Sequence, residues 1–147
     1  MSMVDVTEKP EIYREAKAKG AVKLRPETIR LIREGKIEKG DPFNVAKVAG
    51  VLAAKNTSSL IPLCHPLPLT SVEVNLRIVG DSKVEVETTV KTKAQTGVEM
   101  EALVAATVAL LTVWDMTKQY EKDERGQYPY TVMQDIRVIR KMKEEGT

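Results

Sequence analysis

The feature that most constrains the fold of this chain is an apolar run within a predicted helix at 98–120. Its middle, ALVAATVALLTVW at 102–114, is apolar on nearly every side of such a helix. A helix with one apolar stripe packs against one surface, whereas a helix that is apolar all round has to be covered on two sides. We therefore expect this helix to lie on a sheet and also to form part of a subunit interface.

Alternating apolar and polar residues predict strands before and after this helix. Gly80, Asp81 and Ser82 separate two of these stretches and indicate a hairpin turn. The last residues of the chain are polar and are expected to fray. The four predicted strands span 12–24, 71–80, 83–91 and 131–142.

Two shorter helices are predicted between the first strand and the hairpin. The first, 26–35, begins at Pro26, a residue favoured at the first helical position, and stops at Gly35. The second, 42–53, follows Asp41, whose side chain can cap the free N–H groups of its first turn.

The resulting order of elements, β-α-α-β-β-α-β, indicates the fold class. Merging the two short helices into one crossover gives the split β-α-β pattern of an α+β, ferredoxin-like fold, in which an antiparallel sheet has helices packed on one face. With 147 residues, 42% of them hydrophobic, the chain suits a single domain spanning 1–147. This architecture hosts many unrelated functions, so the fold alone predicts none of them.

Composition argues against several classes of protein. The net charge of +2 is far below the basic excess of a nucleic-acid binder, and aromatic residues, which stack on bases, are 4% of the chain. The chain has neither about 18 consecutive apolar residues nor a secretory signal, so we expect no membrane association and a cytoplasmic location. One cysteine and one histidine are too few ligands for a structural zinc site, and no metal-binding residues are predicted, although these counts leave a carboxylate-assisted metal site open.

The single cysteine and the single histidine, Cys64 and His65, stand side by side in LIPLCHPLPL at 60–69. Three prolines in this segment exclude a helix or a central strand and predict a rigid loop. Rigid loops suit binding sites because they lose little entropy on ordering. Two interpretations stay open: a packed thiol beside a histidine with a local hydrogen bond, or His65 as a ligand for an anion or phosphate.

Charged residues mark both ends of the long predicted helix. Glu99 and Glu101 either balance the helix dipole or accept hydrogen bonds from a guanine or pterin ring. Asp115 and Lys118 form either an ordinary surface ion pair or a proton-transferring pair in a partly dry pocket. Glu101 and Asp115 are 14 positions apart, about 21 Å on a straight helix, so one site that uses both needs a long ligand or a second chain. Spacing alone assigns no role to the remaining cations Arg14, Lys39, Lys55 and Lys141.

Two long segments resemble a known family. The runs KGDPFNVAKVAGVLAAKNTSSLIPLCHPLPLTSVEV and KTKAQTGVEMEALVAATVALLTVWDMTK closely resemble the molybdenum cofactor biosynthesis protein C family, the cyclic pyranopterin monophosphate synthases. The similarity extends from MVDVTEK to the last predicted strand. It implies a ferredoxin-like protomer, a homohexamer built as a trimer of dimers, and active sites at subunit interfaces.

The resemblance also implies an activity in molybdenum cofactor (molybdopterin) biosynthesis. The expected enzyme is a pyrophosphate-releasing phosphorus-oxygen lyase that converts (8S)-3′,8-cyclo-7,8-dihydroguanosine 5′-triphosphate into cyclic pyranopterin monophosphate. A partner radical SAM enzyme that cyclises GTP would supply this substrate. No cofactor is expected to be required, although Mg²⁺ can accompany the substrate triphosphate. The alternatives are an RNA-binding ferredoxin-like module and an oligomeric domain that binds a nucleotide without turning it over.

The motifs of the family also assign roles to individual residues. Lys39 of KGD and Lys118 of WDMTK resemble the catalytic lysines, and Asp115 resembles the acid that pairs with them. The ending KMKEEGT differs from the Gly- and Lys-rich tail of bacterial members, and Trp114 and Asn56 stand where Tyr and Arg are more frequent. The residues implied to bind substrate are Leu63, Cys64, His65, Glu99, Met100 and Glu101, with Arg14, Lys55 and Lys141 as phosphate ligands.

Overall fold

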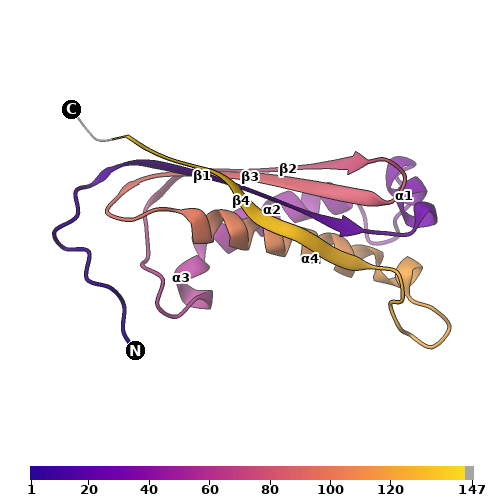
Figure 1. The fold of residues 1–147 in the computed structure, drawn as a ribbon. Coiled ribbons are helices and arrows are strands. Elements are labelled where there is room, and N and C mark those ends of the chain that lie inside the picture. Colours follow the sequence, from indigo (N-terminus) through magenta and orange to yellow (C-terminus); the bar gives the residue numbers. More distant parts are fainter. Residues whose placement is uncertain (145–147) are drawn as a thin grey trace.

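The computed structural model describes residues 1–144 as an antiparallel sheet with helices on one of its faces (Figure 1). Every predicted strand and helix is present, and the two short helices lie in the crossover from the first strand to the second. The α+β class is therefore confirmed. In chain order the elements are β1 (Ile12–Lys23), α1 (Pro26–Arg33), α2 (Pro42–Lys55), α3 (Thr57–Leu60), β2 (Leu69–Val79), β3 (Lys83–Ala94), α4 (Glu99–Glu121) and β4 (Val132–Glu144).

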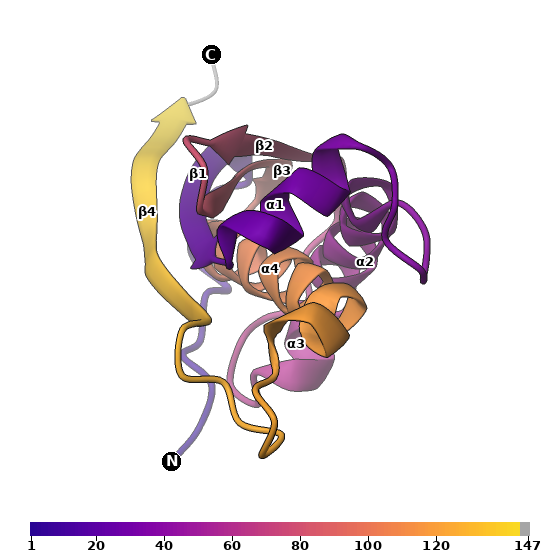
Figure 2. The same cartoon turned by 90° about the vertical axis from the view of Figure 1, so that its right-hand side faces the viewer.

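The sheet has the strand order β2-β3-β1-β4, and each neighbouring pair is antiparallel. This order is the one that the split β-α-β pattern predicts, so the ferredoxin-like fold is confirmed. In the end-on view of Figure 2, β4 forms one border of the sheet, and α4 and α2 lie next to each other on its helical side. The outer face of the sheet carries charged side chains, such as those of Lys17 and Glu87, which form an ion pair.

The ends of the elements differ from the predicted ends by a few residues. α1 stops at Arg33, and Gly35 follows with a φ of +67°, a left-handed conformation that glycine adopts without strain. β2 begins at Leu69 because its pairing with β3 continues to that residue. β4 continues to Glu144, so the prediction that the tail frays directly after residue 142 is wrong for Lys143 and Glu144, which pair with β1. The rest of that tail, 145–147, lies outside the described residues.

The one element that the sequence did not predict is α3, a single turn directly after α2. It has four residues, too few to show a helical period. Thr57 is buried, and its hydroxyl donates to the carbonyl oxygens of Ala53 and Ala54. α3 therefore closes the end of α2 and directs the chain into the proline-rich loop.

α4 is the central helix of the domain, and the sheet and α2 cover two of its sides (Figure 2). By length and composition α4 could cross a membrane, yet its buried residues belong to the core of this domain. α2 approaches it closely, since a Cβ added to Gly50 would lie 3.2 Å from the carbonyl oxygen of Ala105. The buried apolar residues of α4 are Ala102, Ala105, Ala106, Ala109, Leu110, Val113 and Met116.

Apolar side chains also reach the surface of the helical layer. On α4, Leu111 is 53% exposed and Met100 is 42% exposed. On α2, Val45, Val48 and Leu52 are exposed and recur at helical spacing, so they share one side of the helix. The helical layer thus presents apolar residues to solvent as well as to the core.

Candidate functional site

Most of the residues singled out in the sequence lie at the two ends of α4, the long helix labelled in Figure 1. At its N-terminal end, Cys64, His65, Glu99, Glu101 and Lys141 form the proline-loop cluster. At its C-terminal end, Lys39, Asp115 and Lys118 form the lysine cluster. Both clusters combine residues that are far apart in the sequence.

Glu101 is the buried acid of the proline-loop cluster. It is 3% exposed, and its Oε2 lies 3.9 Å from Cys64 Sγ. Its other oxygen, Oε1, is buried without a hydrogen-bond partner among the described residues. Burial raises the pKa of Glu101, and the nearby Glu99 carboxylate adds to this shift. A buried acceptor with free lone pairs suits an N–H group of a ligand.

Burial also governs the chemistry of the cysteine. It raises the pKa of the Cys64 thiol, and the charge of Glu101 raises it further. A thiol that keeps its proton is a weak nucleophile. Cys64 therefore contributes shape and a weak S–H donor to this cluster.

The N-terminal segment holds His65. The Nε2 atom of His65 lies 2.7 Å from the carbonyl oxygen of Val4, so this nitrogen carries a proton and donates it. Gln95 Nε2 donates to the carbonyl oxygen of Thr7 at 3.4 Å, a second contact of the same segment. A hydrogen bond of His65 is thus present, but it is not the local one expected of a loop histidine, because Val4 is 61 positions away in the sequence. Within residues 1–144 the Nδ1 atom has no hydrogen-bond partner.

Two of the predicted phosphate ligands lie at the same end of the domain. Lys141 Nζ is 3.4 Å from Glu99 Oε1, which brings the end of β4 to the first turn of α4. Arg14 on β1 is buried and donates from Nε to Ala94 O at 3.1 Å and from Nη2 to Gln95 O at 3.3 Å. A guanidinium has more N–H donors than these two bonds use.

The other predicted binding residues are exposed. Leu63 lies in the proline-rich loop and is 45% exposed, whereas Met100 projects from the first turn of α4. Lys55 is the last residue of α2. None of these three side chains is enclosed within the described part of the chain.

The lysine cluster joins α4 to the loop between α1 and α2. Lys118 Nζ lies 3.0 Å from Asp115 Oδ1. Lys39 Nζ lies 3.6 Å from Asp115 Oδ2 and donates to the carbonyl oxygen of Asp115 at 3.0 Å. Two ammonium groups therefore contact one carboxylate. The α4 helix alone would form only the ion pair between Asp115 and Lys118.

These contacts set the charge states of the cluster. The hydrogen bond from Lys118 lowers the pKa of Asp115, and the charge of Lys39 supports the shift. The same hydrogen bond raises the pKa of Lys118. The three side chains are between 41% and 57% exposed, so the partly dry pocket expected from the sequence is not enclosed by one chain.

One chain does not bring the two clusters together. α4 is uninterrupted from Glu99 to Glu121, so the 14 positions between Glu101 and Asp115 correspond to about 21 Å. This agrees with the separation expected from the sequence.

Sequence reasoning missed the residues that hold these groups in place. Tyr120 and Gln119 in the last turn of α4 contact Glu38, the neighbour of Lys39. Polar residues at a helix end are typical of a solvated surface, so their sequence gave no signal of this contact. The carbonyl of Val4, which holds His65, is a backbone group and leaves no mark in the sequence.

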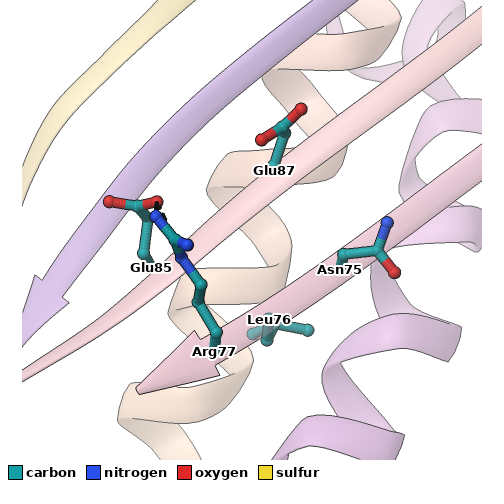
Figure 3. A pocket seen from close by; sticks show the side chains of 5 residues that line it. All are labelled: Asn75, Leu76, Arg77, Glu85 and Glu87. Atoms are coloured by element: carbon teal, nitrogen blue, oxygen red, sulfur yellow. Dashed lines mark hydrogen bonds and ion pairs between the residues drawn. The ribbon is translucent and has the colours of Figure 1, made fainter. Parts of the chain in front are cut away.

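Two depressions in the surface lie away from both clusters. One of about 150 Å³ is on the outer face of the sheet, where Arg77 and Glu85 form an ion pair at 2.7 Å (Figure 3). Another of about 330 Å³ lies between α1 and the turn that joins β2 to β3. Within residues 1–144, no group of three or more His, Cys, Asp or Glu side chains is placed to hold a metal ion.

Comparison with known proteins places these residues in a family. A sequence profile of the MoaC family matches residues 3–144. A "probable cyclic pyranopterin monophosphate synthase" of Pyrococcus furiosus is 56% identical over 145 residues, which cover 99% of this chain and 92% of the relative. A protein of the same name from Saccharolobus solfataricus is 53% identical over 97% of this chain and 95% of the relative. Another, from Sulfolobus acidocaldarius, is 51% identical over 98% of this chain and 100% of the relative. With a profile match and relatives that span nearly its whole length, this chain belongs to the MoaC family.

Proposed function

We propose that this chain is a cyclic pyranopterin monophosphate synthase of molybdenum cofactor biosynthesis. Its substrate is (8S)-3′,8-cyclo-7,8-dihydroguanosine 5′-triphosphate, and its products are cyclic pyranopterin monophosphate and pyrophosphate. The name of the relatives, which are more than half identical to it, supports this reaction. The observation that carries the proposal is the lysine cluster, in which the KGD and WDMTK motifs bring two lysines to one carboxylate.

Lys39 and Lys118 are the proposed acid and base of the reaction. Opening of the guanine imidazole ring, formation of a pyrazine ring and attack on the α-phosphate all move protons, and amines held at fixed positions can give and take them. The carboxylate of Asp115 holds both amines, and its lowered pKa keeps it ionised to low pH. The raised pKa of Lys118 favours its protonated form, which suits a proton donor.

The proline-loop cluster is the proposed binding site for the ring system. The free Oε1 of Glu101 can accept an N–H of the guanine or pterin ring, with Glu99 beside it as a second acceptor. Leu63, Cys64 and Met100 would then pack around the ring.

The triphosphate is proposed to bind to the cations near this cluster. His65, Arg14, Lys55 and Lys141 can stabilise the charge that develops as pyrophosphate leaves. We expect no resident cofactor. Mg²⁺, if it takes part, would enter with the triphosphate itself.

The separation of the clusters supports an assembly with shared active sites. The lysine cluster of one copy and the proline-loop cluster of another would meet at an interface, as in the proposed homohexamer built as a trimer of dimers. The exposed apolar residues of α2 and α4 are the surface that such contacts would cover.

Light scattering tests the assembly through Val48, which is 61% exposed on α2. Val48→Asp places a charge on the apolar side of α2, so the variant is expected to give a smaller particle than the wild type. Val79→Asp is the matched control, because Val79 is an exposed apolar residue at the end of β2, where Lys19, Lys83 and Glu85 are its neighbours. A wild-type monomer would contradict the proposal.

Turnover of the cyclised GTP intermediate tests the reaction directly. The pterin product is oxidised to its fluorescent derivative and measured for the wild type and for Lys118→Ala. We expect product from the wild type and at least a 100-fold lower rate from the variant, because general acid-base catalysis contributes about 10²–10⁴-fold. A correctly assembled wild type that binds the intermediate without converting it would favour a non-catalytic nucleotide-binding domain.

The place of the reaction in the cell follows from its substrate. A radical SAM enzyme that cyclises GTP is the proposed supplier of the intermediate, and the cytoplasm is the proposed location of both enzymes. Activity with the product of a purified GTP cyclase, and none with GTP alone, is the expected result.

A further inference from the structure

The loop at 34–41, between α1 and α2, carries Lys39 and has one buried anchor. Ile37 is 6% exposed, and its carbonyl oxygen accepts the backbone N–H of Gly40 at 3.1 Å. Gly40 has a φ of +118°, a conformation that favours glycine, so the loop turns sharply directly after Lys39. The turn leaves Lys39 at the tip of the loop, beyond the anchor.

A second attachment lies between the anchor and Lys39. The backbone N–H of Glu38 donates to the hydroxyl oxygen of Tyr120 at 2.8 Å. The Glu38 carboxylate accepts a hydrogen bond from Gln119 Nε2 at 2.9 Å. Both partners belong to the last turn of α4, the helix that also carries Asp115 and Lys118. One helix end therefore holds the backbone and the side chain of the residue before Lys39.

The ion pair of Lys39 does not fix its position alone. Its side chain is 41% exposed, and that of Asp115 is 57% exposed. Water and salt screen exposed ion pairs, and a long lysine side chain loses entropy when it is held in one geometry. The amine keeps its position only if the backbone at its base is fixed.

We infer that Tyr120 and Gln119 are positioning residues for Lys39, which act by clamping Glu38 to the end of α4. The inference rests on the proposed function, because it gives the clamp a purpose in catalysis. Catalytic groups displaced by about 1 Å can lose about 100-fold in rate. The clamp therefore acts on the chemical step through Lys39 and not through contact with the substrate.

Tyr120→Phe removes the hydroxyl and keeps the aromatic ring. We expect kcat to fall about 10-fold while KM changes less than about twofold, since Lys39 acts on the reacting atoms. Tyr130→Phe is the matched control, because Lys23 Nζ lies over the Tyr130 ring, 4.3 Å from its centroid, and within residues 1–144 no hydrogen bond joins Tyr130 to Glu38 or to the lysine cluster. Wild-type kcat in Tyr120→Phe would overturn the inference.

An exchange of partners tests the side-chain half of the clamp. Gln119→Glu places a carboxylate against the Glu38 carboxylate and is expected to lower kcat. Adding Glu38→Gln restores an amide-carboxylate hydrogen bond with donor and acceptor exchanged, so most of the lost kcat should return. A purely structural role of Gln119 would not be rescued in this way, and failure of the double variant to recover would count against the clamp.

Hydrogen exchange separates this inference from the proposed function. The amide of Glu38 should exchange faster in Tyr120→Phe than in the wild type, and Tyr130→Phe should leave it unchanged. This measurement needs no turnover. An inactive wild type would contradict the proposed function, whereas the exchange rate of the Glu38 amide would still test the clamp. Unchanged exchange at Glu38 in Tyr120→Phe would show that no clamp exists.

Discussion

Replacing Glu121 is expected to destabilise the domain more than any change of a surface acid. Glu121 is fully buried at the end of α4. Its carboxylate accepts the backbone N–H of Arg25 at 3.0 and 3.2 Å and the hydroxyls of Thr28 and Thr131. Arg25 is the N-cap of α1 and has no side-chain cap of its own, so Glu121 caps this helix from a distant part of the chain.

The size of the effect follows from these donors. A buried donor left without a partner costs about 1–3 kcal/mol, and Glu121→Ala leaves three of them together with a cavity. Because the two threonine hydroxyls can rotate toward other partners, we expect a total of about 3–5 kcal/mol. Glu121→Gln keeps one acceptor oxygen and should lose about 1–2 kcal/mol, mainly the charge-assisted part of the bonds.

Thermal unfolding followed by circular dichroism measures this difference. For a chain of this size, 1 kcal/mol corresponds to roughly 2–4 °C, so Glu121→Ala should lower Tm by roughly 6–20 °C. All variants are compared at one protomer concentration, because the proposed assembly would make Tm depend on concentration. Glu124→Ala, an exposed acid of the next loop, serves as control. An equal Tm for the two alanine variants would refute the reasoning.

Two further predictions concern packing and burial. Because burial raises the pKa of Glu101, the folded chain binds more protons than the unfolded chain, and stability should fall as pH rises from about 4. The Tm advantage of Glu101→Gln over the wild type should thus grow with pH, and a constant difference would contradict the buried acid. Gly50→Ala should cost about 1–3 kcal/mol in urea unfolding despite the better helix propensity of alanine, because its Cβ would meet Val74 Cγ2 at 2.9 Å. A more stable variant would show that α2 can move away.

Much of this fold could be predicted from local patterns. Pro26 and Pro42 begin their helices, and Asp41 caps α2 by accepting the N–H of Phe43 at 2.9 Å. The strands follow the alternation of apolar and polar residues. A one-residue change of register would turn the apolar side chains from the core to solvent, so this alternation also fixes the register. α3 has too few residues to carry such a signal.

The candidate site was predictable only in part. The motifs and the length of α4 indicated two groups of residues at a distance, and the structure places them at opposite ends of this helix. Tertiary contacts between distant segments leave no local pattern, which is why the roles of Glu121 and Tyr120 were missed. Glu121 even begins the charge-rich run EKDERGQ, whose composition is typical of a solvated loop.

One active site is proposed to use the lysine cluster of one copy and the proline-loop cluster of another. Complementation distinguishes such a shared site from a site within one chain, with Lys118→Ala and His65→Ala first assayed alone and then dissociated and reassembled together. We predict very low turnover for each variant alone and recovery in the mixture of about a quarter of wild-type turnover, the share of interfaces that pair two intact clusters. A mixed assembly that forms and stays as inactive as its parents would contradict the shared site.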